Sequence, residues 1–315
     1  MKRLLLCLLL ITTATATAAE RGVSIRRDFG TLHGTLAEPE GGSETVVLII
    51  AGSGPTDRNC NNPHGLRTNS FPYLSEELSR AGIASLRYDK RGIGESLFND
   101  PRKMAEVVFE DFIGDAAAWA DYLAGQGYRK IVLFGHSEGA LIALCAAQDN
   151  PQITAVVSAS GPGYPFDEVL KSQLSRQFPL TEMALYLRAD GILTSLKRGE
   201  KVADIPQPLI SLFHPSVQPF LISILRYDPR ELIRKLEIPV LIVQGDNDLQ
   251  VTADNADQLA KAQPRAKRVI IEGMTHTLKK SEGRTQADQI RAYTNSTLAL
   301  DPDLAKAVTA FTGDL

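Results

Sequence analysis

The stretch that decides the fold is residues 131–147, IVLFGHSEGALIALCAA. It consists of two apolar runs with Gly135, Ser137 and Gly139 at their junction. A short apolar run closed by glycine is typical of a strand that is covered on both faces. A serine between two glycines, where such a strand passes into a helix, indicates a turn so sharp that neighbouring side chains would clash. We therefore expect the Ser137 hydroxyl at the carboxyl end of a sheet, where open α/β sheets place their ligands.

Strand and helix patterns alternate on both sides of this turn. Residues 23–42 predict an antiparallel strand pair that ends in a turn. Further strands are predicted over residues 45–54, 83–89, 130–135, 153–160, 239–248 and 266–276, and helices over 72–82, 109–128, 138–148, 254–263 and 302–313. This alternation predicts an α/β fold with a mostly parallel sheet of about eight strands and helices on both faces.

The alternation is interrupted between Gly161 and Glu237, where the sequence offers only helical patterns that prolines divide into short pieces. We interpret residues 162–236, approximately, as a helical cap inserted over one end of the sheet. Because strand and helix patterns resume after it, one sheet receives strands from both sides of the insert. Residues 19–315 are therefore expected to form one domain.

The first 18 residues have the three-part pattern of a secretory signal peptide. Lys2 and Arg3 precede an apolar run, and Ala16-Thr17-Ala18 offers a cleavage site. We expect export to the periplasm or the exterior and no stable membrane span in the mature chain, because the apolar run is too short. Its removal, with Lys2 and Arg3, changes the formal net charge of the 315-residue chain from −3 to −5, which does not suit nucleic-acid binding.

Two cysteines follow the predicted signal peptide, Cys60 and Cys145. They could pair in an oxidising compartment. Cys145 lies in an apolar helical run, however, which favours a buried free thiol.

A serine hydroxyl becomes a good nucleophile only beside a base that a carboxylate orients. In an enzyme built around a GxSxG turn, the acid and then the histidine follow the serine along the chain, after late strands. His276 has this position, and Asp246 and Asp248 both satisfy the order. Of the other histidines, His136 is expected to pack or hydrogen-bond beneath the turn, and His214 to line the pocket or be buried in the insert.

A charged oxygen that develops during attack on a carbonyl needs backbone N–H donors. One candidate is the N–H of Glu138, directly after the serine. The second lies in the loop AGSGPTDRN that follows an early strand. Ser53 is the best-placed donor in it, with Gly54 as its neighbouring alternative.

The motifs AGSGPTDRN, YDKRGIGES, GHSEGA, GDNDLQV and MTHTLK, taken together, resemble the α/β-hydrolase superfamily, and in particular bacterial serine esterases grouped with the serine aminopeptidase type. The resemblance extends over nearly the whole mature chain. It implies the α/β-hydrolase fold, Ser137 as nucleophile, His276 as base and Asp248 as the orienting acid, with Asp246 in a turn. Where other hydrolases have His-Gly before the oxyanion loop, this chain has Ala51-Gly52.

We therefore predict a serine hydrolase that cleaves small carboxylic esters through an acyl-enzyme, without a cofactor or metal. No HExxH, paired CxxC or phosphate-loop motif is present in the sequence. One alternative is an aminopeptidase-type serine peptidase, which must bind a free ammonium group; another is a non-catalytic binding protein on a hydrolase scaffold. Cap carboxylates that could bind the ammonium are Glu168, Glu182, Asp190 and Asp204.

Overall fold

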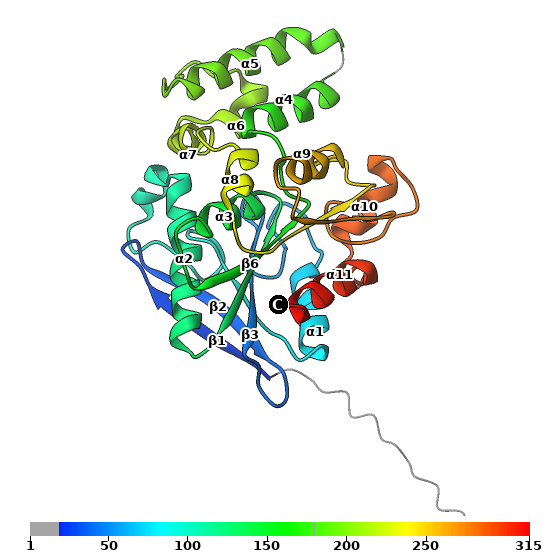
Figure 1. Ribbon diagram of the computed structural model, residues 1–315. Helices are drawn as coiled ribbons and strands as arrows, with labels where there is room; N and C mark the ends of the chain where they lie inside the picture. Colours follow the sequence, from blue (N-terminus) through cyan, green and yellow to red (C-terminus); the bar gives the residue numbers. More distant parts are fainter. Residues whose placement is uncertain (1–18, 179) are drawn as a thin grey trace, which may run out of the picture.

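An eight-stranded sheet forms the centre of the computed structural model, which describes residues 19–178 and 180–315 (Figure 1). The spatial order of the strands is β1-β2-β4-β3-β5-β6-β7-β8. β2 pairs antiparallel with β1 and β4, and the other pairs are parallel. The strands are β1 (Ala19–Arg26), β2 (Thr31–Glu38), β3 (Thr45–Ile50), β4 (Ala84–Tyr88), β5 (Lys130–His136), β6 (Ile153–Ala159), β7 (Val240–Gly245) and β8 (Lys267–Ile271). The predicted strand pair and the mostly parallel sheet are confirmed.

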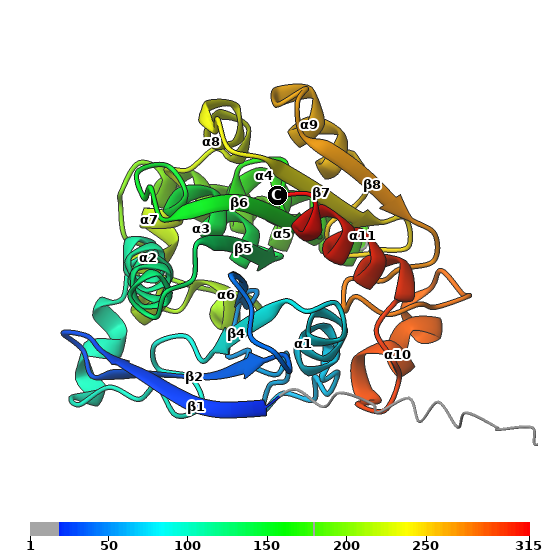
Figure 2. The ribbon, with the colours of Figure 1, turned by 60° about the horizontal axis from the view of Figure 1, so that its bottom comes forward.

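Helices cover both faces of this sheet, as Figure 2 shows. One face packs against α2, α3, α8 and α9 through a core that includes Trp119 and Leu141. The opposite face packs against α1 and α11 through Phe71 and Leu304. These helices are α1 (Ser70–Arg80), α2 (Phe109–Gly125), α3 (Glu138–Ala146), α8 (Pro229–Lys235), α9 (Asp254–Ala262) and α11 (Pro302–Gly313).

The central strand β5 and the helix that follows it are the most enclosed part of the molecule. β5 lies between β3 and β6, and all nine residues of α3 are buried. This burial explains why both runs of residues 131–147 are apolar, without the polar face of a surface helix. The turn between them lies at the carboxyl end of the parallel strands, as predicted.

The residues between β6 and β7 form the helical cap, seen above the sheet in Figure 1. The cap helices have their own apolar core, which includes Leu174, Ile192 and Phe213. The cap contains α4 (Phe166–Gln177), η2 (Leu180–Glu182), α5 (Met183–Lys197), η3 (Gln207–Leu209), α6 (Ile210–Phe213), η4 (Pro215–Val217) and α7 (Gln218–Ile224), and α8 leads from it back to the sheet.

The segment Gln207–Lys235 is long and apolar enough to be considered as a membrane span. In the structure it is divided into several short helices, and α6 and α7 contain four and seven residues. A single membrane-spanning helix needs about 20 residues. Prolines at positions 208, 215, 219 and 229 account for the division.

Two helical segments were not expected from the sequence: η1 (Pro101–Glu106) and α10 (Gln286–Thr294). α10 precedes the last helix and lies beside the loop that follows β8, so it contributes to the site described below. The predicted signal peptide, residues 1–18, lies outside the described residues.

Candidate active site

Ser137 occupies a strained turn between β5 and α3. Its φ of 56° and ψ of −122° are a conformation that L-residues rarely adopt. The turn is fixed by its backbone, because the Ser137 N–H donates to the carbonyl of Ala159 (3.0 Å) and the Ser137 carbonyl accepts from the N–H of Ala140 (2.9 Å). Such a conformation costs about 1–3 kcal/mol and is typical of functional sites. It leaves the Ser137 side chain on the wall of a pocket.

The two glycines of the turn are required by close backbone contacts. A Cβ on Gly135 would lie 2.2 Å from the carbonyl oxygen of Gly139, and a Cβ on Gly139 would lie 2.3 Å from that of Ile50. Real Cβ atoms do not approach so closely. The expectation that side chains would clash at this turn is confirmed.

Asp248 and His276 form a buried hydrogen-bonded pair. Asp248 follows β7, His276 lies in the loop after β8, and His276 Nδ1 donates to Asp248 Oδ2 (2.8 Å). Burial alone would raise the pKa of Asp248. The charge interaction and hydrogen bond with His276, together with the N–H groups of Val251 (2.9 Å) and Gln250 (2.8 Å), lower the pKa below its usual value. The carboxylate therefore stays ionised and fixes the tautomer of His276, which leaves Nε2 free to accept a proton.

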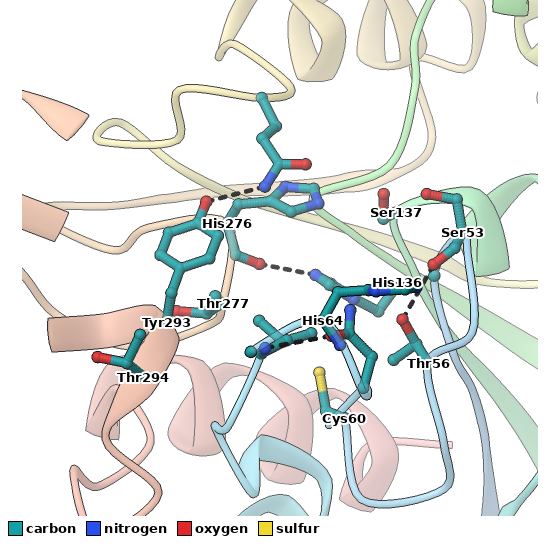
Figure 3. A pocket seen from close by; sticks show the side chains of 15 residues that line it. Ser53, Thr56, Cys60, His64, His136, Ser137, His276, Thr277, Tyr293 and Thr294 are labelled. Atoms are coloured by element: carbon teal, nitrogen blue, oxygen red, sulfur yellow. Dashed lines mark hydrogen bonds between the residues drawn. The ribbon is translucent and has the colours of Figure 1, made fainter. Parts of the chain in front are cut away.

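Ser137 and His276 line the same pocket, which has a volume of about 450 Å³. In Figure 3 the imidazole of His276 points toward the Ser137 side chain. Among the described residues, no direct hydrogen bond joins the Ser137 hydroxyl to this imidazole. Catalytic hydrogen bonds are often long before a substrate binds and shorten in its complex.

His136 supports the loop that contains His276. Its Nε2–H donates to the carbonyl oxygen of His276 (2.7 Å), and the two ring centroids are 4.9 Å apart. Burial and the neighbouring His276 ring lower the pKa of His136 to about 3. A neutral His136 beneath the turn confirms the prediction made for this residue.

The segment Gly52–Ser53 passes close to the turn. A Cβ on Gly52 would lie 3.0 Å from Ser137 Cβ, and Ser53 lines the pocket with Ser137 and His276. Glu138 begins α3, where the first N–H groups of a helix have no partner within the helix. The two segments predicted to supply oxyanion donors thus meet at Ser137.

Lys90 connects these two segments. It is 2% exposed, and its Nζ donates to the carbonyl oxygen of Gly52 and lies 3.4 Å from Glu138 Oε1. Sequence reasoning did not single out Lys90, although it belongs to YDKRGIGES, one of the motifs on which the family resemblance rests. Its neighbour Arg91 has a structural role, with two hydrogen bonds to Asp115 (2.7 Å each).

Tyr293 is a second lining residue that the sequence did not reveal. It belongs to α10, and its hydroxyl accepts from Gln250 Nε2 (2.9 Å) at the wall of the pocket. Thr294 and His64 also line this pocket. Because α10 has few apolar residues, the sequence offered no signal for Tyr293 and Thr294.

Two other candidates lie away from the pocket. Asp246 accepts from the N–H of Gly273 (2.7 Å) and pairs with Arg284 (2.8 Å), so it belongs to a turn as predicted. The prediction for His214 was wrong. It is an exposed residue directly after the end of α6, and its ring hydrogen-bonds with the Ser216 hydroxyl (2.7 Å).

The two cysteines of the described residues form no disulfide. Cys60, which lines the pocket, and Cys145 are both buried and free, so they do not pair. Within residues 19–178 and 180–315, no group of three histidine, cysteine or carboxylate side chains is arranged to hold a metal ion.

Three comparisons with known proteins agree with this architecture. Esterase EstD of Thermotoga maritima is 27% identical over 260 residues, which cover 81% of this chain but only 60% of EstD. Est1E of Butyrivibrio proteoclasticus superposes with a TM-score of 0.59 at 20% identity, covering 93% of this chain and 98% of Est1E. The proline iminopeptidase of Mycobacterium smegmatis gives the same TM-score at 14% identity, covering 93% and 98%.

The two structural likenesses show the fold alone, since both are distant in sequence. The model of the family described as serine aminopeptidase, S33, matches residues 64–282, which include the turn, the cap and both members of the Asp248–His276 pair. This chain therefore belongs to that family, within the α/β-hydrolase superfamily.

Proposed function

We propose that this protein is a serine hydrolase that cleaves carboxylic esters through an acyl-enzyme. The observation that carries the proposal is a buried Asp248–His276 pair whose imidazole shares a pocket with the strained Ser137. Nucleophile, base and orienting acid are thereby supplied in the order that this fold requires. The likeness to a protein named as an esterase supports the same class.

The proposed reaction has two steps. His276 Nε2 takes the proton of the Ser137 hydroxyl as its oxygen attacks the ester carbonyl, and the resulting imidazolium gives that proton to the departing alkoxide. Water then attacks the acyl-serine, again losing a proton to His276, and Ser137 regains a proton as the acid leaves. Asp248 stabilises the imidazolium in both steps. The N–H groups of Ser53 and Glu138 are the proposed donors to the oxyanion, each worth about 3 kcal/mol of barrier.

A peptidase that releases amino-terminal residues is the main alternative. Its pocket would need a carboxylate to bind the free ammonium group of the substrate. The cap carboxylates do not supply one at the pocket. Asp190 pairs with Lys171 (2.7 Å) and Asp204 with Arg188 (2.9 Å), both away from Ser137, while Glu168 lies in a separate depression beside Arg230. None of the described residues that line the Ser137 pocket is an aspartate or a glutamate. These observations favour an ester over an aminoacyl substrate.

The test is a parallel assay of the chain without residues 1–18 on p-nitrophenyl esters and on aminoacyl p-nitroanilides. We expect ester turnover to exceed anilide turnover, and Ser137→Ala to lower kcat by a factor on the order of 10⁶. Ser172→Ala, which alters an exposed serine of the cap, is the matched control and should keep wild-type rates. Faster anilide turnover would favour the peptidase, and a folded wild type inactive on both would favour the binding protein.

We also propose that the chain is exported and acts in the periplasm or outside the cell. The support is the sequence pattern of residues 1–18. Expression of the full chain in a bacterial host, followed by fractionation and amino-terminal sequencing, should give a protein that begins at Ala19 outside the cytoplasm. Recovery of an uncleaved cytoplasmic chain would contradict export.

A further inference from the structure

Two cavities meet at the residues that border the proposed oxyanion hole. Gly52, Ser53 and Ser137 line the pocket that contains His276. The next residues along each segment, Gly54 and Glu138, line a second cavity of about 210 Å³. A carbonyl group bound at Ser137 would therefore lie next to both cavities.

The two cavities differ in chemistry. Most residues that line the pocket beside His276 have polar side chains, among them Thr56, Asn62, Gln250 and Tyr293, and we call it the polar pocket. The second cavity is mainly apolar. Its apolar wall includes Phe98, Met104, Val107, Phe112, Val217 and Phe220.

The cap closes one side of the apolar cavity. Val217 ends η4, and Phe220 belongs to α7, where its ring packs edge-on against Phe112 of α2 at 5.7 Å between centroids. Met104 of η1 and Val217 form the outer rim of the cavity, where Met104 is 54% exposed and Val217 is 38% exposed. The cavity thus has a fixed aromatic base and a rim that tolerates changes of side chain.

The path of the proton decides which part of an ester enters which cavity. The leaving oxygen must face His276, because it receives its proton from that imidazole. The alcohol portion therefore occupies the polar pocket, and the acyl substituent on the same carbonyl carbon points away from His276. We propose that the apolar cavity is the acyl-binding site; this assignment rests on the esterase function proposed above.

The charges at the inner end of the cavity restrict the acyl group further. Glu138 lies beside the buried Lys90 Nζ (3.4 Å), and Arg91, which also lines the cavity, pairs with Asp115 (2.7 Å). Among the described residues that line this cavity, an aminoacyl ammonium would therefore find no carboxylate free of a cation. The volume of about 210 Å³ is smaller than the 300 Å³ or more of a site for drug-sized ligands. The structure therefore assigns the site to short, uncharged apolar acyl groups.

The test separates acyl from alcohol selectivity. An acyl series keeps p-nitrophenol as the leaving group and compares hexanoate with acetate; an alcohol series keeps acetate and compares benzyl with ethyl esters. Val217→Trp narrows the apolar cavity at an exposed rim, and Met104→Trp is a second, more exposed variant for the same purpose. Leu66→Trp, at the wall of the polar pocket, is the matched control.

We expect Val217→Trp and Met104→Trp to lower the hexanoate-to-acetate ratio of kcat/KM by about tenfold, and to leave the benzyl-to-ethyl ratio within about twofold. Leu66→Trp should change the benzyl-to-ethyl ratio and leave the hexanoate-to-acetate ratio within about twofold of wild type. The assignment is overturned if the rim variants change the alcohol ratio instead, or if both leave the acyl ratio as in wild type. A wild type that hydrolyses none of these esters would contradict the esterase function itself. This result can be told apart from a failure of the acyl-site assignment, because it is seen before any variant is compared.

Discussion

At Ser137 the backbone and the proposed chemistry depend on each other. The residue adopts φ 56° because the chain passes from β5 into α3 within one residue, and this bend leaves its hydroxyl in the pocket. The backbone strain of about 1–3 kcal/mol is offset by burial of the two apolar runs on either side. A sequence pattern could reveal this residue because a sharp turn requires glycines at fixed neighbouring positions.

His136 provides a pH test at the same scale. Its pKa is about 3 in the folded protein, whereas an unfolded histidine titrates near 6.5. Between these values the unfolded chain binds a proton that the folded chain does not. Stability therefore falls as the pH decreases from about 6.5 toward 3, by up to about 1.4 kcal/mol per pH unit.

We expect His136→Gln, whose amide can still donate to the His276 carbonyl, to reduce this slope. Urea unfolding at several pH values between 4 and 7 measures it. The exposed His214→Gln is the control and should keep the wild-type slope. Equal slopes for wild type and His136→Gln would contradict the account of a buried neutral imidazole.

At the scale of the elements, the proposed oxyanion hole depends on two segments from different parts of the chain. Gly52–Ser53 follows β3 and Glu138 begins α3, and the Lys90 side chain, which follows β4, contacts both. We interpret Lys90 as a positioning residue, since it holds the Gly52 carbonyl and thereby the orientation of the next N–H. The sequence did not predict this role because the contact depends on how three strand ends meet.

We expect Lys90→Met to lower kcat for p-nitrophenyl acetate by up to about 10²-fold with little change in KM, because small displacements of catalytic groups have such effects. It also leaves Glu138 buried without its cation, which destabilises the fold. The double variant Lys90→Met/Glu138→Gln removes that charge and should recover stability but not kcat. Steady-state kinetics and urea unfolding separate the two effects, and a double variant with wild-type kcat would show that Lys90 has no positioning role.

Helix α10 could not be predicted from the periodicity of apolar residues in the sequence. Its sequence, QADQIRAYT, has a single large aliphatic residue, Ile290, which is 59% exposed, and its buried positions are Gln289 and Ala292. Without an apolar face the helical period could not be detected. Tyr293 at its end was therefore missed as a pocket residue, although strands with continuous apolar runs were predicted correctly.

At the scale of the whole molecule, a buried charge cluster joins the first hairpin to the sheet and α2. Asp115 of α2 is fully buried and bonds Arg91 after β4 (2.7 Å) and Arg27 of the β1–β2 turn (3.1 Å). Breaking a buried ion pair by removing one partner typically costs about 3–5 kcal/mol. We expect this loss in the free energy of unfolding of Asp115→Ala, measured by urea titration.

The matched control is Asp204→Ala in the cap. Asp204 pairs with Arg188 at 2.9 Å, but its side chain is 96% exposed. Exposed ion pairs contribute about 0–1 kcal/mol, so this variant should be nearly as stable as wild type. Similar losses in the two variants would contradict a special role for the buried cluster.

The whole architecture was more predictable than the shape of the pocket. Hydrophobic periods fixed the sheet, the two helical layers and the position of the cap, because these depend on local patterns and on simple rules of chain connection. Chain order after the strands gave Ser137 and His276 and left Asp246 and Asp248 both open as the acid, and the family resemblance selected Asp248. The pocket walls could not be predicted, because η1, α10 and the cap residues Val217 and Phe220 reach them only through tertiary packing.

The most direct test of the central claim is covalent labelling of the folded chain, residues 19–315, with a fluorophosphonate, followed by mass spectrometry of its peptides. We predict a single phosphonyl adduct on Ser137 in wild type and in Ser172→Ala, none in Ser137→Ala, and labelling of Asp248→Asn slowed by about 10⁴-fold if the carboxylate orients His276 as described. Stoichiometric labelling of Ser137→Ala, or an unlabelled but folded wild type, would contradict the claim that Ser137 is an activated nucleophile.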